Sequence, residues 1–372
     1  MTQPRALART RQLLLAVVVA LATLLVPAGA AQGAGGGPAL TVMTRNLYLG
    51  SGLDALVTAP DQGAFVAAVG QTWNNVVATD FPARAEALAA EVRATRPDVI
   101  GLQEVSLWRE QPVGDIVLGE TDPNAEDVVY DFLAILLAEL GERGQSYVAV
   151  STSVNADVEA PRANALSPTQ TTDVRLTDRD VILVRAPLAR KFVNPQDGHY
   201  DVQLSLPTAA GPVTFTRGWA SIDYRHDARR TVRIFDTHLE VGAPFPAALA
   251  QQAQGLEFLG LVAQSPFPVV ALGDFNSAAD GSTTPTYGLL TGALTDAWTT
   301  ARPGDPGLTC CQSELLDDPV PAATSRIDLI LTTGAWPADR AARTGATPFR
   351  ASPAPLWASD HYGVVTRLQL PR

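Results

Sequence analysis

Six short apolar stretches of this chain each adjoin an Asn, Asp, Glu or His, and this pattern constrains the fold strongly. Each stretch has the length and β-branched content of a buried strand. One polar residue at a strand end is commonly a turn or helix-cap residue. Six such ends indicate instead a site assembled where rigid sheets end. The polar residues are Asn46, Glu104, His238, Asp274 with Asn276, Asp328, and Asp360 with His361.

Apolar periodicity predicts the elements that carry these residues. The expected strands cover residues 40–47, 98–105, 147–153, 181–185, 213–216 (extending toward 224), 232–238, 268–272, 327–332 and 363–370. The expected helices cover residues 81–96, 124–142 and 247–263. On the first helix, Leu88 and Val92 form the apolar stripe and Arg84 is assigned to the polar remainder. Because strands occur both singly and in pairs, the pattern favours a two-sheet sandwich with outer helices over a doubly wound sheet.

The N-terminus has the pattern of an export signal. Three arginines precede an apolar run over residues 13–26, and Ala28-Gly29-Ala30 supplies the small residues of a cleavage site. The run is shorter than the roughly 20 residues of a membrane-spanning helix. We therefore predict a signal peptide over residues 1–30, a flexible lead-in over 31–38, a catalytic domain over 39–372, and a secreted protein. A retained membrane anchor is the alternative.

Charge and cysteine content bear on partners. The formal net charge is −11, and loss of residues 1–30 with their three arginines makes it −14. This acidity disfavours nucleic acid as a partner, although an acidic chain can still carry a local patch of arginines. The two cysteines, Cys310 and Cys311, are adjacent, so they form either a vicinal disulfide or two thiols. Their spacing does not fit a zinc site, which indicates a structural role.

Six short motifs occur in a familiar order: TRN, LQEV, THLE, GDFN, RID and SDH. In this order the sequence resembles the endonuclease/exonuclease/phosphatase superfamily. That group contains pancreatic-type deoxyribonucleases, abasic-site endonucleases, inositol polyphosphate 5-phosphatases and bacterial neutral sphingomyelinases. The resemblance covers about residues 40–370. It implies an α+β fold, a four-layer αββα sandwich of two mixed β-sheets flanked by helices, with the site at one edge of the sheets.

Residue chemistry and the resemblance agree on a metal. Mg²⁺ prefers oxygen ligands and is usually held by one or two carboxylates, and Mn²⁺ suits similar ligands. Glu104 is the main candidate ligand, with Asn46 and Asp360 beside it. We therefore expect a Mg²⁺ or Mn²⁺ cofactor that polarises a phosphoryl oxygen.

The resemblance also implies roles for the catalytic residues. Asp274 is similar to the family aspartate that orients or deprotonates the attacking water, and Asn276 to the residue that hydrogen-bonds the phosphorus centre. His238 and His361 resemble the two histidines that contact the scissile phosphate. Asp328 resembles the aspartate that holds the last histidine, which would fix its tautomer and raise the imidazole pKa.

Two further residues match the family less specifically. Arg217 is similar to an arginine near the phosphate, with a surface arginine as the alternative. Asp178 is assigned to orient His238, although Asp180 competes for that role and either could be a solvated charge.

The expected function is hydrolysis of phosphate esters by a phosphodiesterase, with phospholipid or sphingomyelin headgroups or small esters as substrates. No GxxxxGK[ST], HExxH or GxSxG motif is present, which argues against phosphate-loop, zincin and serine-hydrolase chemistry. An extracellular nuclease is the first alternative, and a non-catalytic binding protein with this fold is the second. The loop around Phe245 allows transient contact with a membrane surface. No obligate protein partner is implied.

Overall fold

The computed structural model describes residues 37–120, 122–164, 167, 170–243 and 245–371. The predicted signal peptide and most of the predicted lead-in lie outside the described residues. In the part of the chain that is described, no helix is long and apolar enough to cross a membrane.

One large mixed sheet, sheet A, has the order β15-β16-β1-β2-β6-β3-β4, with β5 paired to β6. Its strands are β1 (Ala39–Asn46), β2 (Val99–Gln103), β3 (Leu107–Gln111), β4 (Asp127–Asp131), β5 (Tyr147–Ala163), β6 (Thr171–Arg185), β15 (Ala338–Thr344) and β16 (Gly363–Gln369). β1 and β2 are parallel, and β16 and β6 run antiparallel on either side of them. The ends of β1 and β2 therefore lie beside the start of β16.

A second mixed sheet, sheet B, has the order β13-β14-β12-β11-β10-β7. Its strands are β7 (Phe192–His199), β10 (Gly218–Arg225), β11 (Thr231–His238), β12 (Val269–Asp274), β13 (Thr295–Asp296) and β14 (Asp328–Thr332). β11 and β12 are parallel, and β14 is antiparallel to β12. β8 (Leu204–Thr208) and β9 (Gly211–Phe215) form a separate two-stranded hairpin.

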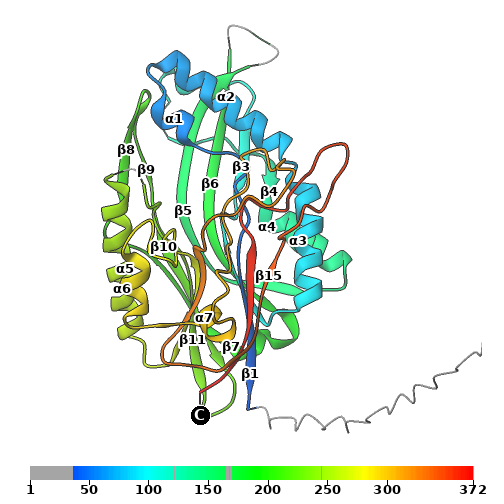
Figure 1. Cartoon of the computed structure of the whole chain (residues 1–372). Coiled ribbons are helices and arrows are strands. Elements are labelled where there is room, and N and C mark those ends of the chain that lie inside the picture. Colours follow the sequence, from blue (N-terminus) through cyan, green and yellow to red (C-terminus); the bar gives the residue numbers. More distant parts are fainter. Residues whose placement is uncertain (1–36, 121, 165–166, 168–169, 244, 372) are drawn as a thin grey trace, which may run out of the picture. The chain divides into compact units, whose positions relative to one another are not determined.

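Most of the helices cover the outer faces of the two sheets (Figure 1), whereas Ala297 and Trp298 of the last helix pack into the interior between the sheets. The seven helices of the described residues follow. They are α1 (Asp54–Thr58), α2 (Gln62–Ala78), α3 (Phe81–Thr95), α4 (Phe132–Glu142), α5 (Ala247–Ala263), α6 (Thr286–Thr291) and α7 (Ala297–Ala301), with 3₁₀ turns η1 (Ile116–Leu118) and η2 (Ala186–Lys191). Apolar residues of α2, α3 and α4 pack on sheet A, and those of α5 and α6 pack on sheet B.

The alternating directions of the apolar side chains along the central strands produce the layers. Ile182 and Val184 face the interior between the sheets, whereas Val181 and Leu183 pack under the helices of sheet A. Side chains of successive strand residues point to opposite faces, so a fully apolar strand must be covered on both sides. This is a four-layer αββα sandwich, and the predicted fold class is confirmed.

The helix predicted over residues 124–142 is wrong in its first part. Residues 127–131 form strand β4, and only Phe132–Glu142 are helical. Asp131 caps the helix, because its side chain accepts hydrogen bonds from the amides of Leu133 and Ala134. The β-branched Val128 and Val129 before this cap favour the extended state.

Candidate active site

The predicted site residues come from both sheets, at the edge where the parallel strands end. Asn46 ends β1 and Glu104 follows β2 in sheet A, while His238 ends β11 and Asp274 ends β12 in sheet B. In the register of sheet B, Asp274 lies opposite His238 on one side and opposite Asp328 on the other. Strand pairing alone therefore brings three of these side chains together.

Close approach of two strands requires a glycine before Asp274. A Cβ atom on Gly273 would lie 2.1 Å from the carbonyl oxygen of Thr237. Two site residues, one after β2 and one after β12, have left-handed backbone, with φ of 55° at Glu104 and 51° at Asn276. Such a conformation costs about 1–3 kcal/mol for a residue other than glycine, and residues in it cluster at functional sites.

The carboxylate of Asp274 lies at the centre of the cluster and is buried. Its Oδ1 accepts the backbone N–H of Asn276 at 2.9 Å, and its Oδ2 accepts the amide of Asn46 at 3.2 Å. The Nε2 atoms of His238 and His361 lie 3.6 and 3.7 Å from the same Oδ2. Burial raises the pKa of Asp274 to about 6, and the nearby charge of His361 partly offsets this effect.

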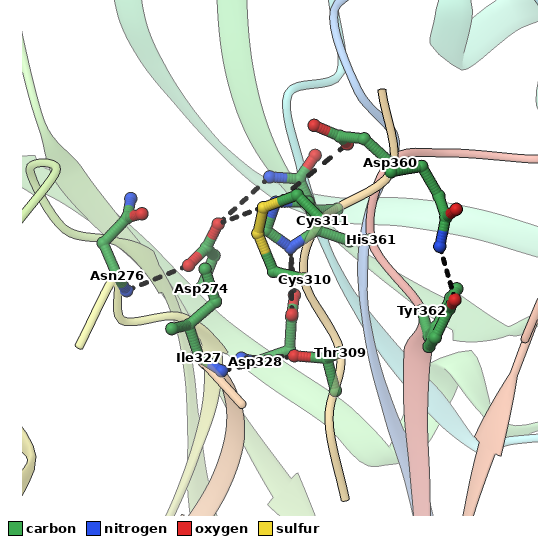
Figure 2. Close-up of a disulfide and its surroundings, with 12 residues drawn as sticks. Asp274, Asn276, Thr309, Cys310, Cys311, Ile327, Asp328, Asp360, His361 and Tyr362 are labelled. Atoms are coloured by element: carbon green, nitrogen blue, oxygen red, sulfur yellow. Dashed lines mark hydrogen bonds and ion pairs between the residues drawn. A yellow bond between two sulfur atoms is a disulfide. The ribbon is translucent and has the colours of Figure 1, made fainter. Parts of the chain in front are cut away.

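His361 is held by Asp328 from behind (Figure 2). The imidazole Nδ1 lies 2.9 and 3.1 Å from the two carboxylate oxygens of Asp328, and both residues are buried. Burial lowers the pKa of His361, but the carboxylates of Asp328, Asp360 and Asp274 outweigh burial and raise this pKa well above its ordinary value. His361 is therefore a cationic ring whose Nε2 faces the cluster.

His238 has the opposite electrostatic environment. Burial and the charge of Arg217 lower the pKa of His238 well below its ordinary value. Its Nε2 lies 3.1 Å from Nδ2 of Asn276, which also donates to the carbonyl of Leu239 at 3.0 Å. The two histidines thus have different charge states at neutral pH, and environments of this kind assign acid and base roles in enzymes.

The predicted metal ligands form an oxygen-rich group next to Asp274. Asn46 donates to Glu104 at 2.9 Å as well as to Asp274, and Glu104 also accepts the amide of Leu49 at 2.7 Å. Burial and the charge of Asp360 raise the pKa of Glu104 to about 7, and burial raises that of Asp360. Crowded carboxylates of this kind are stabilised by a hard divalent cation, so the donor set fits Mg²⁺ or Mn²⁺.

A second set of close metal-binding atoms comes from Asp274, Asp328 and His361. Because the Nδ1 of His361 already contacts Asp328, these two side chains satisfy each other. Asn46, Glu104 and Asp360 offer oxygen ligands alone, which a hard divalent cation prefers, so this group is the better candidate for the ion.

Arg217 and Asp178 both line the cleft above the cluster. Among the described residues the Arg217 guanidinium has one distant partner, Glu240, at 3.5 Å, which leaves donors available to a phosphate. Among the described residues no hydrogen bond joins Asp178 to His238. The Nδ1 of His238 and the Oδ1 of Asp178 are each buried without a partner. The orienting contact predicted for Asp178 is therefore not made in this geometry.

The cleft has a volume of about 300 Å³ and is lined by eight of the predicted site residues. These residues are Glu104, Asp178, Arg217, His238, Asp274, Asn276 and Asp360 with its neighbour His361. Asn46 and Asp328 lie behind this surface and contact Asp274 and His361, as described above. The ten predicted residues thus lie in this cleft or directly behind it.

Arg84 supports the site, although the sequence predicts that it lies on the polar side of helix α3. Its side chain is fully buried, and its guanidinium donates to the carbonyls of Leu47, Tyr48, Thr79 and Ala358. The carbonyls of Leu47 and Tyr48 belong to the turn that follows Asn46, and that of Ala358 belongs to the segment that precedes Asp360. The burial of Arg84 could have been predicted, because residues 84, 88 and 92 share one helical stripe at i, i+4 spacing.

Glu314 is a second supporting residue that the sequence did not reveal. Its carboxylate accepts from Ser51, Gly52 and Asn75 at 2.8–2.9 Å, and its carbonyl accepts the hydroxyl of Tyr48. Glu314 therefore fixes the turn that forms one wall of the cleft. It lies in a loop with no periodic pattern, so no local signal identifies it.

Cys310 and Cys311 form a vicinal disulfide beside His361, as Figure 2 shows. Cys310 pairs with His361 in an isolated β-bridge. Two backbone hydrogen bonds of the flanking residues continue this contact. The carbonyl of Thr309 accepts the N–H of Tyr362 at 2.7 Å, and the N–H of Gln312 donates to the carbonyl of Asp360 at 2.8 Å. The disulfide thus braces the segment that carries the two C-terminal site residues.

Replacing both cysteines by serine is expected to lower kcat by at least about tenfold, because small displacements of a catalytic group are costly. The measurement is kcat before and after treatment with dithiothreitol. The native protein should lose activity on reduction, and the double-serine variant should be insensitive to it. Unchanged kcat in the variant would show that the bracing is dispensable.

A separate group of carboxylates lies between the sheets behind the site. Asp236 is fully buried, and one carboxylate oxygen accepts from Gln103 at 2.6 Å. Its other oxygen has no hydrogen-bond partner among the described residues. Asp180 is also fully buried, and neither of its oxygens has a hydrogen-bond partner in the described part of the chain. Burial raises the pKa of both residues well above the ordinary value. Asp180 therefore lies in the interior and not in the cleft.

Asp236→Asn is expected to reduce the pH dependence of stability. The folded protein holds the proton of Asp236 more tightly than the unfolded chain, whose ordinary pKa is 3.8. The stability associated with this proton is complete below about pH 4 and is lost as the pH rises toward the folded pKa. Between pH 5 and 8 the wild-type free energy of unfolding should therefore fall more steeply with rising pH than that of the variant. Urea unfolding at several pH values measures this difference, and parallel curves would contradict it.

Comparisons with known proteins agree with this architecture. The sequence profile of the endonuclease/exonuclease/phosphatase family matches residues 69–361. A family protein from Leptotrichia buccalis C-1013-b is 14% identical, with a TM-score of 0.53 over 89% of this chain and 100% of that one. One from Bacteroides thetaiotaomicron is 17% identical, with a TM-score of 0.53 over 90% and 99%. The comparison with curated proteins gives no match. On the extent of the profile match, this chain belongs to the endonuclease/exonuclease/phosphatase family, whose members hydrolyse phosphate esters.

Proposed function

We propose that this chain is an exported, divalent-metal-dependent phosphodiesterase. The proposal depends on one observation, the convergence of two histidine Nε2 atoms on one oxygen of Asp274 within 3.7 Å, at the base of a cleft. Export is supported by the signal pattern of residues 1–30. Membership of a phosphate-ester hydrolase family supports the reaction class.

Asn46, Glu104 and Asp360 would hold Mg²⁺ or Mn²⁺, which supplies charge stabilisation at a phosphoryl oxygen and the leaving group. Burial and mutual repulsion of the two carboxylates support this assignment, because a cation at this position offsets both effects.

Asp274 and His361 would carry the proton transfers. With a pKa of about 6, Asp274 is mainly ionised at neutral pH and basic enough to take a proton from water. As the water oxygen bonds to phosphorus, the bond from phosphorus to the ester oxygen breaks. The cationic His361 donates its Nε2 proton to the departing oxygen, and Asp328 stabilises the imidazolium.

His238, Asn276 and Arg217 would bind the phosphate oxygens. Arg217 supplies a permanent charge, and its weak pairing with Glu240 at 3.5 Å leaves its donors available to an incoming phosphate. Asn276 is held by its bond to the carbonyl of Leu239, which fixes the direction of its amide. Preorganised donors of this kind stabilise charge that develops in the transition state.

The protein from residue 31 onward, assayed with bis-p-nitrophenyl phosphate and Mg²⁺ or Mn²⁺, tests the proposal. We expect hydrolysis that is abolished by EDTA and by His361→Ala. His226→Ala is the matched control, since His226 lies in the turn between β10 and β11 and should retain full activity.

Absence of hydrolysis with either metal and with every ester would favour a non-catalytic binding protein. Activity confined to plasmid DNA or RNA would favour the nuclease alternative. Activity that survives EDTA would reject the metal.

A further inference from the structure

The catalytic cleft continues into an apolar channel. Two further cavities of about 390 and 50 Å³ adjoin the cleft of about 300 Å³, and all three share Leu53 and Phe215. Leu176 also lines both the cleft and the smallest cavity. A group bound at the catalytic cluster can therefore extend directly into this space, which we call the apolar channel.

One wall of the channel is the β8–β9 hairpin. Its inward residues, Leu204 opposite Phe215 and Leu206 opposite Val213, line the cavities, while Ser205 on the other face is exposed. The hairpin joins neither large sheet. An isolated two-stranded hairpin is marginally stable in water, so its apolar face needs a partner.

Apolar residues make up most of the remaining walls as well. Helix α1 contributes Leu56 and Val57, and β5 contributes Val158 and Ala160. Figure 1 shows α1 and the hairpin beside the upper part of β5. The lining extends along β5 from residue 156 in the catalytic cleft to residue 161, roughly 16 Å at the usual rise per strand residue.

Charge decides what this channel excludes. The charged residues that line its outer part are Glu120, Asp122 and Glu159, and no arginine or lysine is among the described lining residues. A nucleic acid or polyphosphate extending from the catalytic cluster would bring phosphates next to these carboxylates, in a part of the channel that no arginine or lysine of the described residues lines. An uncharged apolar chain meets no such penalty and is favoured by burial of its surface.

We propose that the apolar channel binds the hydrocarbon chain of an amphiphilic phosphate ester whose phosphate lies at the catalytic cluster. This inference rests on the proposed phosphodiesterase activity and names its substrate class. The chain would cover the inner face of the hairpin and the apolar residues of β5 and α1. Hydrolysis itself would follow the proton transfers already assigned to Asp274 and His361.

Methyl, butyl and octyl p-nitrophenyl phosphates, assayed below their micellar concentrations, test the proposal. Each releases p-nitrophenol and leaves the corresponding alkyl phosphate, so only chain length varies. We expect kcat/KM to rise with chain length, by up to about fourfold for each methylene buried. Equal kcat/KM for the three esters would overturn the channel and leave the phosphodiesterase intact.

A variant of the hairpin supplies a second test. Val213→Asp places a charge in the channel, and we expect the ratio of kcat/KM for the octyl ester to that for the methyl ester to fall at least tenfold. Ser205→Asp places the same charge on the exposed face of the hairpin and should leave this ratio unchanged. The ratio is insensitive to the fraction of folded protein. An equal effect of both variants would contradict the proposal.

Binding separates failure of the channel from failure of the activity. Calorimetry with methyl and octyl phosphate requires no turnover, and we expect the octyl compound to bind at least tenfold more tightly. If no ester is hydrolysed but octyl phosphate binds in this way, the channel stands and the proposed activity falls. Equal binding overturns the channel. A comparison of octyl ester in solution with phospholipid vesicles then distinguishes a free amphiphile from a membrane lipid as the source.

Discussion

Asp274→Asn is expected to lower kcat for bis-p-nitrophenyl phosphate by about 10²- to 10⁴-fold, the range typical of a lost general base. Asparagine has nearly the same shape and can still accept the amide of Asn276, so the turn should be retained. It cannot take a proton from water at neutral pH. The fold should therefore survive while the chemistry is lost.

Two measurements check this expectation, the steady-state kcat and the affinity for Mn²⁺ determined by calorimetry. Asp280→Asn is the control, because Asp280 is exposed and lies six residues away. Affinity for Mn²⁺ should remain near normal in Asp274→Asn. If it is lost together with kcat, the ion is bound by the Asp274, Asp328 and His361 set instead.

Glu104→Gln is expected to raise the half-saturating concentration of Mg²⁺ by at least about 100-fold. Residues outside the ligand shell typically contribute about 10- to 100-fold to metal affinity, so a direct ligand should contribute at least as much. A 100-fold loss corresponds to about 2.8 kcal/mol. Glutamine keeps an oxygen for the amide of Leu49, which separates the loss of charge from loss of the turn.

Titration of activity with Mg²⁺ measures this effect, and saturating metal should restore much of kcat. Glu142→Gln, at the exposed end of helix α4, should titrate as the wild type does. A variant with normal metal dependence but low kcat would exchange the roles assigned here to Glu104 and Asp274.

The sequence predicted the site better than it predicted the elements that support it. Asn46, Glu104, His238 and Asp274 stand at strand ends, and register alone brings such residues together once the strands pair. The four-layer arrangement required the family resemblance, because periodicity shows which strands are buried but not which sheet each one joins.

Residues that act through tertiary contacts could not be recovered in the same way. Glu314 reaches the turn at Ser51 across more than 260 positions, and only the completed fold brings them together. The strand predicted from 213 toward 224 is interrupted at Thr216 and Arg217, and this interruption directs Arg217 into the cleft. Asp178 was assigned by position within a motif, but the side-chain direction that leaves it without a contact to His238 is not encoded locally.

The division of the site between the sheets has a consequence for inactivation. Asn46, Glu104, Asp360 and His361 lie on or next to strands of sheet A, and His238, Asp274 and Asp328 lie on strands of sheet B. The two halves of the site therefore stay in register only while the two sheets remain packed together. A misplacement of about 1 Å can reduce a reaction rate a hundredfold. On heating or in denaturant, turnover should therefore be lost while the circular dichroism of the strands is still native. Loss of activity would then report the first separation of the two sheets.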